Sequence, residues 1–330
     1  MITFSKANIR MWSRLGPSGT FGMMMNELAE EDLKLTVVTA DLCFYSGLDR
    51  FRRNHEEMYY NFGIAEQNMI GAAAGLASEG FNVFATSYAS FAATRCSDQV
   101  KVNMAYMKLP VKLVGLTAGL SAGILGATHM SYGDIAVMRA MPNLTILSPA
   151  DCTETVKAVK AASAWQGPVY LRLTGGMPAP VVYREDYEYE IGKGIVLKEG
   201  EEIAVIAAGS MVYRAGKAIE RLEAEGISCG LIDMHTIKPL DTDLLDKLCE
   251  KYKMIVTVEE HSVIGGLGSA VSEYIADKRK IPLRRLGLSD DYAAAAEYEY
   301  LIEKSGLSAE GIYDSVRQFR RGVADGCRCG

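Results

Sequence analysis

Long hydrophobic runs are missing from this sequence. No stretch of about 18 apolar residues occurs, which is the length a membrane-spanning helix needs. The first residues, Met1 to Lys6, also lack the apolar segment of a secretory signal peptide. We therefore expect no membrane span and a cytoplasmic protein.

Basic charge, histidine and paired cysteine are scarce as well. The formal net charge is −6 and no basic patch is evident, which argues against a nucleic-acid partner. Four histidines are too few for a histidine-rich metal centre, and we predict no metal ligands in this chain. Its seven cysteines are odd in number and mostly isolated, so a disulfide framework is not expected and a reducing compartment fits.

The 330 residues that are present suffice for two domains. Short β-branched runs alternate with helical patterns, which predicts two successive α/β domains with parallel or mixed sheets. We place the first domain at 1–175, a linker at 176–190 and the second domain at 191–330. The expected strands cover 35–39, 82–85, 111–116, 145–147, 169–173, 203–207, 228–232 and 254–258. The expected helices cover 66–78, 90–107, 151–165 (capped by Asp151), 211–225 and 241–251.

The most informative stretch is Tyr60-Asn61-Phe62-Gly63-Ile64-Ala65-Glu66-Gln67-Asn68. Its single carboxylate, Glu66, opens a helix of small apolar residues. A carboxyl group in such a helix is costly to bury unless something hydrogen-bonds it. Residue chemistry alone leaves two readings open: a charge favoured by the helix dipole at the first turn, or a working acid in a dry site.

This stretch resembles the Gly-Ile-Ala-Glu-Gln-Asn segment of the transketolase family, whose members use thiamine diphosphate. The similarity runs from about Thr36 to the C-terminal region. Four further motifs follow in family order: Thr39-Ala40-Asp41-Leu42, Arg139-Ala140-Met141-Pro142-Asn143, Thr236-Ile237-Lys238-Pro239-Leu240 and Val258-Glu259-Glu260-His261. The resemblance implies a pyrimidine-binding domain followed by a transketolase C-terminal domain.

By this resemblance, Glu66 is a catalytic residue that hydrogen-bonds N1′ of the cofactor's aminopyrimidine and favours its imino tautomer. Tyr88 and Phe91 match aromatic residues that pack on that ring. A pair of aromatic residues three apart also suits an ordinary helix packed into a core. Only the neighbouring family motifs favour the interpretation that these two rings pack against the cofactor.

The resemblance assigns three more residues to the site. Asp41 matches an aspartate near the thiazolium ring, although a turn residue at a strand end would look the same. Leu42 would touch the edge of the cofactor. His129 would be a catalytic residue on the substrate side, and its alternative is a satisfied loop histidine.

One family motif has no counterpart here. Family members bind the cofactor's diphosphate and its Mg²⁺ or Ca²⁺ through Gly-Asp-Gly and a later asparagine, and no Gly-Asp-Gly occurs in this chain. The chain begins close to where the family's diphosphate-binding domain would end. We therefore expect an N-terminal partner subunit that carries the diphosphate and the metal, and an α2β2 assembly.

The substrate residues depart from the family pattern. An acidic pair is replaced by Ile124-Leu125, and a family histidine aligns with Thr117. Two arginines that hold the sugar phosphate align with Gly175 and near Ser18, which removes bidentate phosphate donors. We expect ordinary phosphoketoses to be poor substrates, or the partner chain to supply the anion site. The changed residues suit ketol transfer on an unusual ketose, such as an apiose or sulfo-sugar derivative.

Other functions stay open at this stage. The chain could belong to a 1-deoxyxylulose-5-phosphate synthase or to a 2-oxoacid dehydrogenase β subunit, which share this half and act on a 2-oxo acid. It could also be a non-catalytic partner subunit. A dinucleotide-binding domain is disfavoured, because no Gly-x-Gly-x-x-Gly follows the first strand. The second domain is expected to be mainly structural, with His261 possible near the entrance of the site.

Overall fold

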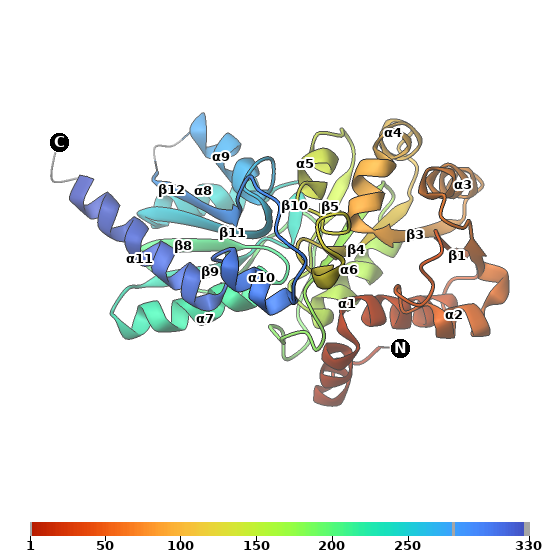
Figure 1. The fold of residues 1–330 in the computed structure, drawn as a ribbon, viewed down its shortest axis with the longest axis horizontal. Coiled ribbons are helices and arrows are strands. Elements are labelled where there is room, and N and C mark those ends of the chain that lie inside the picture. The colour runs from red at the N-terminus through yellow and green to blue at the C-terminus, as the bar shows by residue number, and fades with distance from the viewer. Residues whose placement is uncertain (1, 279–280, 327–330) are drawn as a thin grey trace.

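The computed structural model describes residues 2–278 and 281–326. The chain forms two α/β units that lie side by side along its long axis (Figure 1). Each unit is built on a mostly parallel sheet flanked by helices. The predicted fold class is therefore confirmed.

The first sheet has seven strands in the order β10-β5-β6-β4-β3-β1-β2. Its strands are β1 (Leu35–Thr39), β2 (Tyr59–Asn61), β3 (Asn82–Tyr88), β4 (Lys112–Ala118), β5 (Thr145–Leu147), β6 (Val169–Thr174) and β10 (Thr236–Lys238). The first six pair in parallel, whereas β10 lies antiparallel to β5 at the edge. Since β10 belongs to the second half of the chain, this sheet extends across the predicted linker, and the division at 175 and 191 stays a prediction.

Helices cover both faces of the first sheet. They are α1 (Lys6–Ala29), α2 (Asp49–Asn54), α3 (Glu66–Ser78), α4 (Ser97–Gln99), α5 (Asp134–Arg139) and α6 (Cys152–Ala164). Asp151 caps α6 as predicted, since its carboxylate accepts the N–H of Glu154 at 2.8 Å. The apolar pattern does not reveal α1, because a kink at Gly16 (φ 72°) before Pro17 interrupts its helical period.

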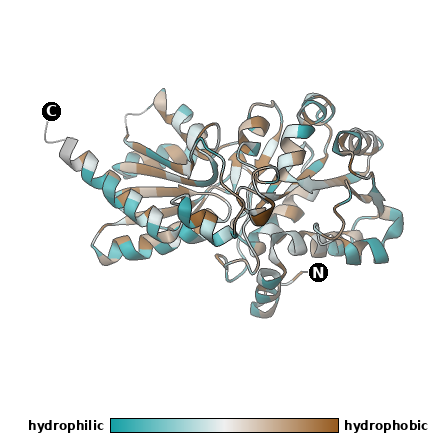
Figure 2. Cartoon of the chain, in the orientation of Figure 1, coloured by the Kyte–Doolittle hydropathy of each residue, from teal (hydrophilic) through white to brown (hydrophobic). Residues whose placement is uncertain are grey.

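The second sheet has five strands in the order β12-β11-β8-β9-β7. Its strands are β7 (Ile195–Lys198), β8 (Ile203–Ala207), β9 (Cys229–Asp233), β11 (Met254–Ser262) and β12 (Leu283–Leu288). The helices of this unit are α7 (Met211–Ala224), α8 (Thr242–Lys251), α9 (Leu267–Ala276), α10 (Tyr298–Lys304) and α11 (Ala309–Gly326). Figure 2 shows apolar strands inside and polar outer faces on α7 and α11. Among the described helices, none is long and apolar enough to cross a membrane.

The two units are joined by more than the linker. One hydrophobic cluster is continuous from Val38 and Met69 in the first unit to Ile255 and Leu267 in the second. Residues 176–190 form no helix or strand, yet Tyr183 is buried and donates a hydrogen bond of 2.8 Å to Asp233. Both units therefore contribute to one packed scaffold around the carboxyl ends of the first sheet's strands.

Candidate active site

Glu66 is the first residue of α3 and is only 3% exposed. The helix packs closely because its buried positions are small or flexible residues such as Ala73, Ala74 and Met69. This packing places the carboxyl group inside the protein at a helix N-terminus, where the helix dipole favours negative charge. Glu66 therefore lies both at the first turn of a helix and out of water, and its role as a working acid stays a prediction.

The buried carboxylate has a cationic partner that the sequence pattern did not reveal. Arg95 donates a hydrogen bond of 2.7 Å from Nη1 to Glu66 Oε1. The guanidinium carbon of Arg95 also lies 4.2 Å from the ring centroid of Phe91. Both residues belong to a π-helical turn, Phe91–Arg95, which lies within the range 90–107 that was predicted to be helical. Such turns often occur at functional sites, because the wider turn shifts which side chains share a face.

Three aromatic rings meet beside this turn. The ring centroid of Tyr88, at the end of β3, lies 5.9 Å from that of Phe91. His129 contacts both rings, with centroid distances of 5.9 Å to Tyr88 and 5.3 Å to Phe91. Burial raises the pKa of Tyr88, so its hydroxyl stays protonated at neutral pH. The structure thus brings together Tyr88, Phe91 and His129, and Arg95 connects them to Glu66.

Asp41 and Leu42 follow directly after β1. Asp41 has a positive φ of 59°, and its backbone N–H donates to Asn61 Oδ1 at 2.9 Å. Asn61 Oδ1 also accepts the N–H of Gly63, so this side chain links the Asp41 turn to the approach of α3. Leu42 packs on the hydrophobic cluster that contains Tyr88. Within the described chain, no hydrogen bond or ring contact joins Asp41 to the aromatic group.

A cavity of about 370 Å³ lies between α1, the Asp41 turn and the start of the linker. Its lining carries no Lys, Arg, Asp, Glu or His side chain. The lining residues are Leu15, Gly16, Pro17, Ser18, Gly19, Phe44, Tyr45, Gly47, Thr117, Ser121, Gly175, Gly176 and Met177. They include the positions at which the sequence lacks the family's histidine and arginines.

The nearby arginine of β6 does not replace the missing ones. Arg172 is buried and donates from Nε to Asp134 Oδ2 at 2.7 Å. Its Nη2 donates to the backbone oxygen of Glu260 at 2.8 Å. Because these contacts hold the guanidinium inside the protein, Arg172 is not placed to bind an anion in the cavity.

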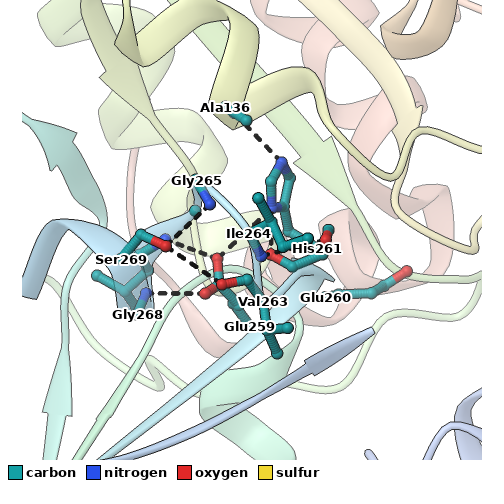
Figure 3. Close-up of polar contacts among 12 residues, drawn as sticks. Ala136, Glu259, Glu260, His261, Val263, Ile264, Gly265, Gly268 and Ser269 are labelled. Atoms are coloured by element: carbon teal, nitrogen blue, oxygen red, sulfur yellow. Dashed lines mark hydrogen bonds and ion pairs between the residues drawn. The ribbon is translucent and has the colours of Figure 1, made fainter. Parts of the chain in front are cut away.

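The Val258–His261 motif lies on β11, between the two units (Figure 3). His261 is fully buried, and its Nε2 accepts the backbone N–H of Ala136 at 3.3 Å. Burial lowers the pKa of His261 to about 4, so the ring is neutral at pH 7. His261 therefore stands inside the protein, away from the entrance that the sequence left open for it.

The hydrogen bonds of Glu66 and the residues around it determine which ligands this site can bind. Glu66 Oε1 is occupied by Arg95, and among the described residues nothing donates a hydrogen bond to Oε2. A carboxylate oxygen left free in this way, joined through Arg95 to an aromatic wall, suits a flat ring with a polar N–H, such as an aminopyrimidine. Within residues 2–278 and 281–326, no group of three or more His, Cys, Asp or Glu side chains is placed to hold a metal ion.

Comparisons with known proteins identify the family of the chain. The model of the transketolase pyrimidine binding domain matches residues 18–177, and the model of the transketolase C-terminal domain matches residues 192–312. The chain belongs to the transketolase family. It corresponds to the C-terminal subunit of the family's two-part enzymes.

Several transketolase subunits are similar to this one over most of their length. A 6-deoxy-6-sulfo-D-fructose transketolase subunit from Clostridium sp. (strain MSTE9) is 38% identical, over 91% of this chain and 92% of its own length. A subunit of an apulose-4-phosphate transketolase from Phocaeicola vulgatus is 38% identical, over 89% of this chain and 94% of its own. A putative transketolase C-terminal section from Methanocaldococcus jannaschii is 39% identical, over 90% and 94%.

Longer transketolase-family enzymes match with about half their length. A 1-deoxy-D-xylulose-5-phosphate synthase from Caldanaerobacter subterraneus is 36% identical over 91% of this chain but only 48% of its own. A solved structure described as a split gene transketolase, inactive beta4 tetramer, superposes with a TM-score of 0.82 at 39% identity, covering 91% of this chain and 96% of that one.

Sequence reasoning missed Arg95 and Asn61 as parts of the candidate site. Asn61 stands in the quoted motif, but its side-chain bond to the Asp41 turn spans 20 residues. Arg95 closes the segment that holds Tyr88 and Phe91, and a cation near a buried acid was the signal available. Arg95 also stands four residues after Phe91, a spacing at which side chains share one face of a helix, so the contact between them was within reach of the sequence pattern.

Proposed function

We propose that this subunit supplies half of a thiamine diphosphate site in a two-part transketolase that moves a two-carbon ketol unit from a ketose to an aldose. The observation that carries the proposal is the placement of Glu66, buried at the start of α3 and joined through Arg95 to an aromatic wall. The full-length match to transketolase subunits supports it.

The family resemblance assigns the cofactor side of the site, and these contacts support it. Oε2 of Glu66 would accept a hydrogen bond from N1′ of the aminopyrimidine, while Arg95 holds Oε1 in place. Tyr88 and Phe91 would pack on the ring and exclude water, which would strengthen the polar contact at Glu66. When bound, thiamine diphosphate supplies the nucleophile that breaks the carbon–carbon bond of the ketose.

The resemblance assigns the remaining residues to the reacting centre. Asp41 would put a negative charge near the cationic thiazolium, and Leu42 would close the edge of the cofactor. His129 stands against Tyr88 and Phe91, from which its ring nitrogens reach a substrate hydroxyl as donor or acceptor. Thr128 Oγ1 lies 3.0 Å from Nδ1 of His129, which leaves Nε2 as the nitrogen for the substrate.

The cofactor's charged tail belongs to a second chain. We propose an N-terminal partner subunit that binds the diphosphate and Mg²⁺ or Ca²⁺, within a cytoplasmic α2β2 enzyme. Large apolar side chains stand exposed at loops around the site: Phe44, Ile64, Ile124 and Met177 are 74%, 79%, 69% and 72% exposed. Apolar groups gathered around an open site are typical of a surface that a partner covers.

The substrate is an unusual sugar. The cavity favours a hydroxylated part of the ketose, and a terminal phosphate or sulfonate has no charged partner among its lining residues. Similar subunits are named for sulfofructose and apulose phosphate. We expect xylulose 5-phosphate with ribose 5-phosphate to be a poor substrate pair, and transketolase-like rates on this pair would contradict the assignment.

A second candidate is a 2-oxo acid as donor, because 1-deoxy-D-xylulose-5-phosphate synthases match the chain at 36% and 37% identity. Steady-state rates with pyruvate and with ketose donors, measured on the complex with its partner, separate the two functions. A non-catalytic role for this subunit is favoured only if Glu66→Ala leaves the complex fully active.

Cofactor titration tests the proposal directly. The chain and its N-terminal partner are co-expressed, and thiamine diphosphate with Mg²⁺ is titrated calorimetrically into the complex and into this chain alone. We expect binding with one cofactor per heterodimer in the complex and none in the lone chain. Tight binding of cofactor and metal by the lone chain would contradict the division of the site.

A further inference from the structure

Glu260 connects the second unit to the candidate active site. It lies on β11 beside Glu259, and both side chains are buried. In Figure 3 the carboxylate of Glu259 turns toward Gly268 at the start of α9, whereas Glu260 points to the opposite side. Two neighbouring glutamates of one motif therefore have different surroundings.

The carboxylate of Glu260 gathers donors from three separate segments. Oε1 accepts the backbone N–H of Leu120 at 2.8 Å and lies 3.5 Å from Ser121 Oγ. Oε2 accepts the hydroxyl of Ser210 and, at 2.7 Å, that of Tyr298. Such charge-assisted hydrogen bonds are the stronger kind. One carboxylate of the second unit thus holds the first unit's chain directly after β4.

The segment it holds is the loop that carries His129, residues 119–131, here named the site loop. The loop is closed at its base by two backbone hydrogen bonds between Gly119 and Ser131, of 3.1 and 2.9 Å. Gly119 has a φ of 69°, and a Cβ atom there would lie 2.5 Å from Glu260 Oε1. The base of the site loop therefore rests directly on the Glu260 carboxylate.

The same contact reaches the cavity. Ser121 lines the cavity, and its Oγ accepts the N–H of Gly175, another lining residue, at 2.9 Å. Tyr298 packs on Gly176, where a Cβ atom would meet its ring at 3.2 Å. Displacement of Glu260 would loosen both the site loop and this wall of the cavity.

We propose that Glu260 is a positioning residue that fixes the base of the site loop, so that His129 rests against Tyr88 and Phe91. The second unit is then part of the site's framework. The consequence for catalysis rests on the proposed function of His129, whereas the placement of His129 can be measured independently.

The test reads the position of the His129 ring in the full chain without cofactor or partner. The chain is labelled with ¹³C at histidine Cε1, and the His129 resonance is assigned with His129→Gln. In Glu260→Ala we expect this resonance to move toward the value of a solvent-exposed histidine, because the ring leaves its two aromatic neighbours. In Glu260→Gln it should stay, since an amide can accept from Leu120 and donate to the hydroxyls of Ser210 and Tyr298.

Glu259→Ala is the matched control for Glu260→Ala. Glu259 is also a buried glutamate on the same strand, but among the described residues its carboxylate accepts hydrogen bonds from the N–H groups of Leu267 and Gly268 and lies 3.8 Å from His261 Nδ1, all in its own unit. It should lower stability without moving the His129 resonance. If Glu260→Ala does not fold, Tyr298→Phe removes one of the four contacts and should shift the resonance less, in the same direction. An unmoved resonance in the folded variant overturns the proposal.

Kinetics of the complex separate this inference from the proposed function. For Glu260→Ala we expect the KM of the ketose to rise on the order of 10-fold or more while cofactor affinity is unchanged, because misplaced substrate contacts are costly. Unchanged KM and kcat alongside a displaced ring would overturn the catalytic consequence. A displaced ring in a complex without any ketol transfer would contradict the proposed function and leave the positioning by Glu260 intact.

Discussion

Arg95 donates a hydrogen bond of 2.7 Å to Glu66 while its guanidinium lies 4.2 Å from the ring centroid of Phe91. One side chain thus connects the buried acid of the site to its aromatic wall. The side chain of Arg95 is 46% exposed, so a partly hydrated cation compensates a carboxylate that is almost completely out of water.

Removing this cation should destabilise the chain. Arg95→Ala leaves the buried carboxylate of Glu66 without its charged partner, and we expect a loss of about 1–3 kcal/mol in the free energy of unfolding, measured with urea. Arg221→Ala is the control, because Arg221 is also 46% exposed and also lies 4.2 Å from a ring, that of Tyr313. Its carboxylate partner, Glu310, is 60% exposed, so we expect about 0–1 kcal/mol. Equal losses in the free energy of unfolding would mean that the burial of Glu66 does not increase the cost of removing its cationic partner.

Removing the negative charge of Glu66 should abolish most of the activity without unfolding the chain. Glu66→Gln keeps the size of the side chain but gives up the charge that favours the cofactor's imino tautomer. In the complex we expect kcat to fall by about 10²–10⁴-fold, the range typical of a lost acid–base contribution. Glu79→Gln, at the exposed end of the same helix, should leave kcat unchanged. Loss of activity in both variants would point to damage to α3 instead of the chemistry of Glu66.

The buried His261 should make the fold sensitive to acid. Its pKa is about 4 in the folded chain because of burial, compared with the ordinary 6.5. Between these values the unfolded chain binds the proton more readily, so stability falls as the pH drops from 6.5 toward 4. In His261→Gln this dependence should be flatter by about 2–3 kcal/mol between pH 7 and pH 4.5. Urea unfolding at the two pH values measures it, and identical slopes for both chains would contradict the assignment.

Much of the site could be anticipated because its motifs are local. Glu66 stands within a continuous sequence motif, at the start of α3. Tyr88 ends β3 and Phe91 follows three residues later, so local structure places these residues. The helix over 66–78 and the strand over 203–207 have the predicted bounds, since each has a clean apolar pattern with nothing to compete against it.

Long-range pairing was beyond the sequence pattern. β10 has only three residues, too few to indicate which sheet they join, and the structure places them beside β5 in the first unit. The contacts of Glu260 reach back about 140 residues to Leu120, and no periodicity encodes such a distance. The π-helical turn at Phe91–Arg95 likewise depends on packing that single-sequence propensity does not describe.

Relieving the backbone strain at Thr117 should raise the stability of the chain but weaken the function of the complex. It has a φ of 49°, which is unfavourable for a β-branched residue, and its hydroxyl is buried without a hydrogen-bond partner. It also lines the cavity, beside an irregularity in the pairing of β4 with β6. Strain kept at such a place is expected to serve the site.

Thr117→Gly should therefore raise the free energy of unfolding by about 1 kcal/mol, because glycine adopts a positive φ without strain. The same change should raise the KM of the ketose in the complex, since the cavity loses a fixed wall. Lys108→Gly is the comparison, at an exposed residue with a φ of 57° outside the cavity lining. It should stabilise the chain by a similar or smaller amount and leave KM unchanged. A Thr117→Gly chain that is less stable than the unaltered one would show that Thr117 contributes packing that outweighs its strain.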